Sequence, residues 1–150
     1  MDTADIRQFV PHAGPMCLLD RILAYGDTWL EAEVTIRADS LFCDGASVGA
    51  WVGIEYMAQA IGAFGGVRAR SQGQAVKIGF LVGTRKYESH WPVFPVGACL
   101  RVRVDQEYEA DNGLSVFDCR LSSADEDVAS ATITVFQPAD PAAYLKGNVA

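Results

Sequence analysis

The chain has 150 residues, of which 50% are hydrophobic and 21% charged, and these proportions are typical of one globular domain spanning 1–150. Its net charge of −7 argues against nucleic acid or an anionic membrane surface as a partner, because both attract basic proteins. The four cysteines show neither a CxxC pair nor zinc-ligand spacing, so we expect reduced thiols in a cytoplasmic protein.

The N-terminal half is expected to begin with two strands. The first ten residues, MDTADIRQFV, lack the apolar run of a signal peptide. A first strand is predicted over 16–25. The segment 28–37, TWLEAEVTIR, alternates apolar and polar residues, and this alternation predicts a half-buried strand.

The segment 48–67, VGAWVGIEYMAQAIGAFGGV, predicts one long helix with a single charged residue, Glu55. A membrane span has adequate length here, but the five glycines from Gly49 onward, Gln59 and the central Glu55 all lower its tendency to insert. A helix that is apolar all round is buried on every side, so we expect a buried helix and no membrane insertion.

Four further strands are expected after the helix, over 76–87, 100–105, 114–122 and 128–136. The sequence Asp111-Asn112-Gly113 predicts a hairpin turn between two of them, and 123–127 the next turn. The order of elements predicts an α+β fold in which a curled antiparallel sheet wraps one helix. From about 138 the tail is rich in Pro, Ala and polar residues and is expected to pack loosely.

Glu55 is the strongest candidate for chemistry, because burying an unpaired carboxylate is costly. It shares a helix face with Trp51, Ala58 and Gln59. The alternative is a structural pair with an arginine. The two histidines, His12 in PHAGPM and His90 in YESHWPVFPVG, are either catalytic or loop residues that bond the backbone. No motif for zinc hydrolysis, serine hydrolysis or nucleotide binding occurs.

Four segments carry a family resemblance: FVPHAGPMCLLDRI, GAWVGIEYMAQAI, KIGFLVGTRKYE and FPVGACLRVRV. Over about 9–138, the chain resembles the hotdog-fold β-hydroxyacyl-carrier-protein dehydratases, and more closely their aryl-polyene branch. The most specific piece is the IE-x-MAQ core of the predicted helix. The resemblance implies a dimer with tunnels at the subunit interface, and no cofactor beyond the phosphopantetheine arm that presents the substrate.

In typical members of that family, a loop histidine and a helix acid from two subunits form the catalytic pair. Glu55 matches the acid, but the histidine position falls near Leu41 in SLFCDGAS, where this chain has no histidine. Our candidates for the missing base are His12, then His90, then Asp44.

The expected activity is removal of water from a 3-hydroxyacyl thioester on acyl carrier protein, giving a trans-2-enoyl thioester. The backbone N–H groups near Gly49 and Ala50, at the positive end of the helix, are expected to stabilise the enolate oxygen, with Gln59 also binding substrate. Two alternatives stay open. One is a hotdog thioesterase in which Glu55 activates water, and the other is a non-catalytic partner in a hotdog heterodimer.

The partners expected from this reading are acyl carrier protein and a second hotdog subunit, either a copy of this chain or a paralogue. An acidic carrier needs a basic patch on an acidic protein. We therefore predict that four cations receive it at a tunnel mouth, against the alternative of scattered surface charge: Arg68, Arg70, Arg85 and Lys86.

Overall fold

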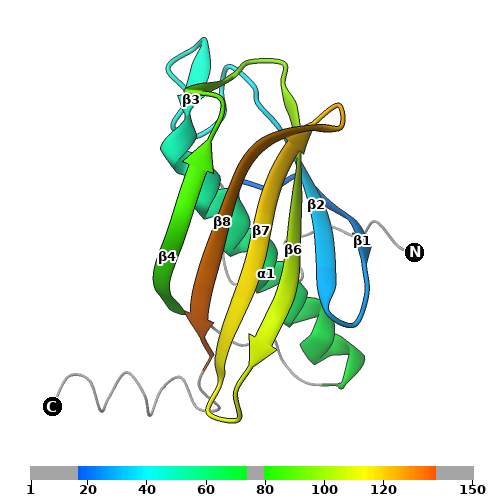
Figure 1. Cartoon of the computed structure of the whole chain (residues 1–150). Coiled ribbons are helices and arrows are strands. Elements are labelled where there is room, and N and C mark those ends of the chain that lie inside the picture. Colours follow the sequence, from blue (N-terminus) through cyan, green and yellow to red (C-terminus); the bar gives the residue numbers. More distant parts are fainter. Residues whose placement is uncertain (1–16, 74–79, 138–150) are drawn as a thin grey trace, which may run out of the picture.

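A computed structural model of the chain describes residues 17–73 and 80–137. Within them, one long helix, α1 (Gly53–Ser71), accompanies a six-stranded sheet in the order β1-β2-β6-β7-β8-β4, in which every neighbouring pair is antiparallel (Figure 1). The strands are β1 (Arg21–Tyr25), β2 (Trp29–Thr35), β4 (Phe80–Ser89), β6 (Cys99–Glu109), β7 (Leu114–Ser123) and β8 (Glu126–Phe136).

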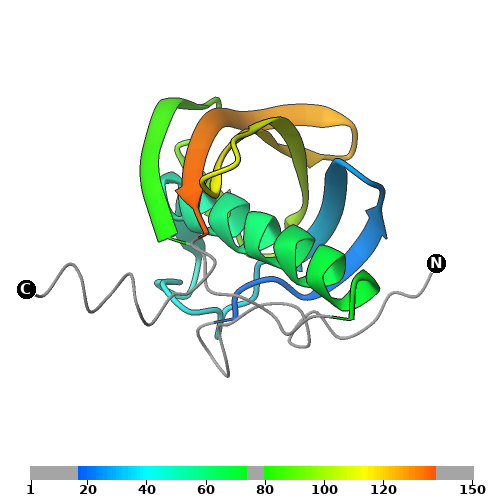
Figure 2. The same ribbon diagram turned by 90° about the horizontal axis from the view of Figure 1, so that it is seen from below.

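The sheet curls around α1, which lies along its concave side (Figure 2). This curl confirms the expected α+β architecture of one helix wrapped by an antiparallel sheet. The burial expected on every side of the helix is only partly observed. Tyr56, Met57 and Phe64 are buried, whereas Ile54, Ala58 and Gly62 form a face that is half-exposed in the single chain.

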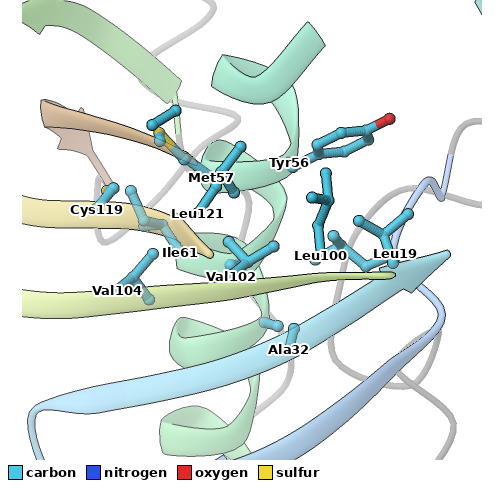
Figure 3. Close-up of a cluster of buried hydrophobic side chains, with 14 of the residues drawn as sticks. Leu19, Ala32, Tyr56, Met57, Ile61, Leu100, Val102, Val104, Cys119 and Leu121 are labelled. Atoms are coloured by element: carbon cyan, nitrogen blue, oxygen red, sulfur yellow. The ribbon is translucent and has the colours of Figure 1, made fainter. Parts of the chain in front are cut away.

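Alternation along the strands creates the core. In β2 the buried positions are Leu30, Ala32 and Val34, and their polar neighbours face outward. Leu30 stands opposite Val104 of β6, so both strands direct their apolar side chains toward α1. Figure 3 shows side chains from β2, β6 and β7 meeting the helix residues Met57 and Ile61. The helix is therefore held mainly by apolar contact.

Two short strands were not predicted. β3 (Ser47–Gly49) pairs with β5 (Val93–Pro95), and a 3₁₀ turn, η3 (Ala50–Val52), precedes α1. The helix expected from 48 therefore begins at Ala50 with a 3₁₀ turn and continues as an α-helix to Ser71. A three-residue strand has too few positions to show periodicity, which explains the omission.

The two predicted turns are present. Asp111–Gly113 closes the β6–β7 hairpin, with the Ala110 N–H donating to the Leu114 carbonyl and Gly113 at φ +98°. Ala124 and Asp125 both take positive φ between β7 and β8, as a tight turn requires.

Several predictions fall beyond the described residues. His12, the start of the first strand at 16, positions 76–79 and the tail from about 138 all lie outside 17–73 and 80–137. In those two ranges the structure contains no helix with the length and apolar content needed to cross a membrane.

Candidate functional site

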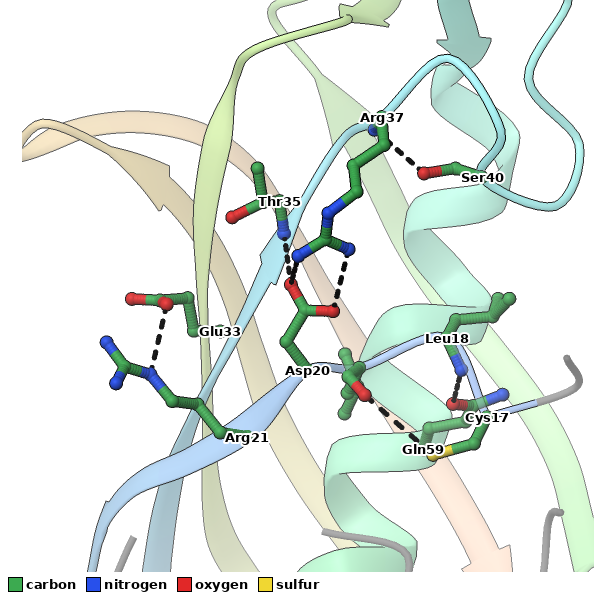
Figure 4. Close-up of polar contacts among 10 residues, drawn as sticks. Cys17, Leu18, Asp20, Arg21, Glu33, Thr35, Arg37, Ser40 and Gln59 are labelled. Carbon is green, nitrogen blue, oxygen red and sulfur yellow. Dashed lines mark hydrogen bonds and ion pairs between the residues drawn. The ribbon is translucent and has the colours of Figure 1, made fainter. Parts of the chain in front are cut away.

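Glu55 is held in place by the side chain of Gln59, one helical turn further along α1. The Gln59 amide nitrogen donates to Glu55 Oε1 at 3.1 Å. The Gln59 oxygen accepts the Leu18 backbone N–H at 2.8 Å (Figure 4). Gln59 is completely buried and Glu55 is half-buried. The buried amide thus orients the carboxylate, and the substrate contact expected of Gln59 stays a prediction.

The beginning of the helix is tied to the second half of the chain. The Ala50 N–H donates to the Pro92 carbonyl at 3.2 Å, and the Ala50 carbonyl accepts the Tyr87 hydroxyl of β4. Gly49 ends β3, opposite Val93. Gly49 and Ala50 therefore lie at the helix start, as predicted, but the Ala50 N–H already has an acceptor in this structure.

A cavity of about 330 Å³ opens beside the segment that precedes β1. Residues lining it include Leu18, Asp20, Arg37, Leu41 and Tyr56. Leu18 also bonds to Gln59, so the cavity borders the group of residues that holds Glu55. Leu41, the position at which the resemblance implies a histidine, forms part of its wall.

An ion pair closes one side of this cavity. Asp20 accepts the Thr35 N–H at 2.7 Å and pairs with Arg37 at 3.2 Å, as Figure 4 shows. The hydrogen bond and charge of Asp20 raise the pKa of Arg37. The Arg37 N–H in turn donates to the Ser40 hydroxyl at 2.8 Å, which fixes the loop after β2.

Asp44 serves the turn before β3. Its carboxylate accepts the N–H groups of Ala46 and Ser47, each at 2.9 Å. These two hydrogen bonds lower the pKa of Asp44 and make it a weaker base. The structure thus gives this candidate base a role in backbone turn formation.

His90 lies near the start of the helix. It follows β4, its N–H donates to the Val128 carbonyl at 2.8 Å, and its side chain is exposed. This bond is made by the main chain of His90, so the role of its imidazole stays a prediction. Pro92, two residues later, contacts Ala50, so His90 stays a candidate base at the helix start.

The four predicted docking cations do not form one patch within a chain. Arg68 and Arg70 belong to the end of α1, where Arg68 pairs with Glu109 through two bonds of 3.0 and 3.1 Å. Arg85 and Lys86 are exposed on β4, next to the Tyr87 that contacts the helix start. The two pairs thus lie roughly 25 Å apart along the helix.

Sequence reasoning missed Tyr56 and Leu18. Tyr56 is 2% exposed, and burial raises its pKa to about 12. A buried tyrosine has the sequence signature of a core residue, and Leu18 acts through its backbone. The one available signal was the position of Tyr56 directly after the acid.

In the described part of the chain, no three His, Cys, Asp or Glu residues gather as a metal site.

A curled antiparallel sheet wrapped around one long helix defines a hotdog-fold protein, and this helix carries the oriented Glu55 carboxylate. The family model described as ApeP-like, ApeP dehydratase, matches residues 4–146. The chain belongs to this family of dehydratases, as the sequence resemblance predicted.

Solved structures show the same fold. The dehydratase heterocomplex ApeI:P from Xenorhabdus doucetiae is similar with a TM-score of 0.88 and 23% identity over 97% of both chains. The protein PA5202 from Pseudomonas aeruginosa has a TM-score of 0.66 and 16% identity, covering 87% of this chain and 97% of that one. A hypothetical thioesterase from Streptococcus pneumoniae, solved with coenzyme A, has a TM-score of 0.60 and 14% identity, covering 77% and 86%. No curated protein matched the sequence.

Proposed function

We propose that the protein eliminates water from a 3-hydroxyacyl thioester carried on the phosphopantetheine arm of acyl carrier protein. The observation that carries this proposal is the Glu55 carboxylate, which is held by the buried Gln59; the other partner of Gln59, Leu18, lines the cavity. Membership of a dehydratase family supports it. In the reaction, a base removes the proton at C2, the C3–O bond breaks, a double bond forms between C2 and C3, and the hydroxyl leaves as water.

Glu55 is suited to handle a proton at the departing hydroxyl. A carboxyl group can donate a proton to a leaving oxygen or hold it by a hydrogen bond. The Gln59 amide fixes its orientation, and fixed orientation reduces the entropic cost of reaching the transition state. For the base, His90 at the helix start and His12 are the candidates.

Replacing Glu55 by Gln tests this role. The Glu55→Gln side chain retains an oxygen for the Gln59 amide, so the fold is expected to persist while turnover of a 3-hydroxyacyl-pantetheine thioester falls at least 100-fold. Enoyl absorbance measures the product. Glu107→Gln, the same change at an exposed residue of β6, is the matched control. Unchanged turnover in Glu55→Gln would remove this carboxylate from the mechanism.

The same incubation distinguishes a thioesterase. The similarity to a hypothetical thioesterase keeps hydrolysis as an alternative, in which Glu55 would activate water. Hydrolysis releases a free thiol, which a thiol reagent detects, whereas elimination gives enoyl absorbance and no thiol. Free thiol from both the saturated and the 3-hydroxyacyl substrate would favour the thioesterase.

A non-catalytic role in a heterodimer is the second candidate. Leu41 occupies the position implied for a histidine, and the similar structure from Xenorhabdus doucetiae is a heterocomplex. The half-exposed helix face with Ile54, Ala58 and Gly62 offers a surface on which a second subunit can pack. Enoyl product from this chain alone, lost in Glu55→Gln, would argue against a merely supporting role.

Carrier docking is proposed for the exposed pair Arg85 and Lys86, since Arg68 already binds Glu109. An acidic carrier is attracted to this pair, so reversing both charges to Glu should slow turnover of the carrier-linked substrate about tenfold. Turnover of the pantetheine-linked substrate should stay constant. The control reverses Arg101 and Arg120, two exposed cations of β6 and β7. Equal effects of the two double variants would contradict docking at β4.

A further inference from the structure

The cavity beside Leu18 is large enough for an organic ligand. Its volume of about 330 Å³ is at the lower end of the range of about 300–1,000 Å³ typical of small-molecule sites. It lies between the segment before β1, the end of β2 with its following loop, and α1. A cavity of this size bounded by three elements is a ready binding site.

Tyr56 contributes a buried hydroxyl to this cavity. The residue is 2% exposed, and in the described part of the chain its hydroxyl has no hydrogen-bond partner. Figure 3 shows its oxygen pointing away from the apolar cluster that contains Met57 and Leu100. A hydroxyl that faces a cavity can donate to water or to a ligand that displaces it, so a ligand oxygen bound here can accept its hydrogen bond.

The charges around the cavity select for an uncharged ligand. Asp20 is balanced by Arg37 and bonded by the Thr35 N–H, so this pair contributes no net charge. Asp39, exposed at the rim, adds one negative charge. A free phosphate or carboxylate is therefore disfavoured, whereas a neutral group with a hydroxyl or carbonyl oxygen meets the Tyr56 donor without a charge penalty.

The cavity also contains the position where the family resemblance implies a second functional group. Leu41 and Tyr56 both line the cavity, and Leu41 is apolar. Tyr56 directly follows Glu55, and side chains on α1 lean toward the start of the helix. Tyr56 thus supplies this cavity with a neutral hydroxyl donor from the helix, which the apolar Leu41 cannot supply.

We propose that Tyr56 determines specificity for hydroxylated acyl groups by donating a hydrogen bond to the 3-hydroxyl oxygen of a 3-hydroxyacyl thioester bound in this cavity. The proposal rests on the proposed function, because that function supplies the substrate class. The raised pKa of about 12 keeps the phenol protonated at neutral pH, so Tyr56 acts as a donor and not as a base.

Binding of two matched ligands tests this assignment. Both are pantetheine amides, in which nitrogen replaces the thioester sulfur to resist turnover; one carries the 3-hydroxyl and the other is saturated at the same chain length. Titration calorimetry on the full chain should show that the hydroxylated ligand binds about threefold to tenfold more tightly. In Tyr56→Phe that ratio should fall to about one, with an unchanged Kd for the saturated ligand.

The control variant is Tyr108→Phe, the same change at a tyrosine of β6 that is 59% exposed, and it should keep the preference. Tyr56→Phe retains the ring that packs on Phe94, with centroids 6.0 Å apart, and an unaltered melting temperature would verify its fold. A preference that persists in Tyr56→Phe, or that is absent from the parent chain, overturns the proposal. Because binding is measured without turnover, a chain that binds as expected but yields no enoyl product contradicts only the dehydratase function.

Discussion

The substitution Gln59→Glu tests the two hydrogen bonds by which Gln59 links Glu55 to the Leu18 backbone. The substitution keeps the shape of the side chain and an oxygen for the Leu18 N–H, but it places a second carboxylate where the amide nitrogen lies 3.1 Å from Glu55 Oε1. Two like charges at that distance repel by about 5 kcal/mol at an effective dielectric constant of 20. At neutral pH the pair therefore lowers its energy by retaining one proton.

Retaining that proton limits the loss of unfolding free energy, because it removes the repulsion between the two carboxylates. Protonating one glutamic acid at pH 7 costs about 1.36 kcal/mol for each pH unit above its ordinary value near 4.3, or about 3.7 kcal/mol. At pH 5 the same arithmetic gives about 1 kcal/mol. We therefore expect the variant to lose about 3–4 kcal/mol of unfolding free energy at pH 7, a fall in Tm of about 7–15 °C, and to recover most of it at pH 5.

Chemical denaturation at pH 5, 6 and 7 measures this effect. The control is Gln72→Glu at the exposed end of α1, where a negative charge costs less than about 1 kcal/mol at either pH. A Gln59→Glu variant whose stability matches this control at pH 7, or whose loss is equal at pH 5 and pH 7, would refute the close contact between positions 55 and 59.

Two further outcomes follow from buried positions. Gly53→Ala should lower the unfolding free energy by about 1–3 kcal/mol in urea, because its Cβ would overlap the Tyr87 hydroxyl. Gly65→Ala, whose Cβ meets only Gln137 at 3.6 Å, should gain up to about 1 kcal/mol, and equal effects would contradict the tight contact at Gly53. The folded pKa of Tyr56, about 12, exceeds its ordinary value of 10, so the folded state binds the proton more tightly and stability should fall between pH 10 and 12. Denaturation of Tyr56→Phe over this range should show a shallower decline, whereas an identical slope would place the hydroxyl in water.

The strands of the fold could be predicted because their chemistry is local. Leu30, Ala32 and Val34 alternate with polar neighbours, and the same alternation marks β6, so both strands follow from the sequence. β3 and β5 could not be predicted, since three residues carry no period and their pairing joins Ser47 to Pro95.

The site was predictable only in part. Glu55 and Gln59 are one helical turn apart, so their shared face follows from helix geometry alone. The Leu18 N–H that bonds to Gln59 comes from a segment 41 residues away in the sequence. Because any residue except proline has a backbone N–H, the residue type does not predict this contact. Tyr56 was hidden for another reason: an aromatic residue in an apolar helix matches the core pattern whether or not its hydroxyl faces a cavity.

The pairing of β2 with β6 determines when this protein can fold during synthesis. Trp29 pairs with Asp105 and Thr35 with Cys99, so α1, β4 and β5 are all translated before β2 meets its neighbour. Until β6 leaves the ribosome, the nascent chain carries an apolar helix and the small β1–β2 hairpin without the sheet that covers them. Closing a loop of this length has a large entropic cost, so the pairing forms slowly. We therefore expect chaperones that bind exposed apolar segments to bind the emerging chain.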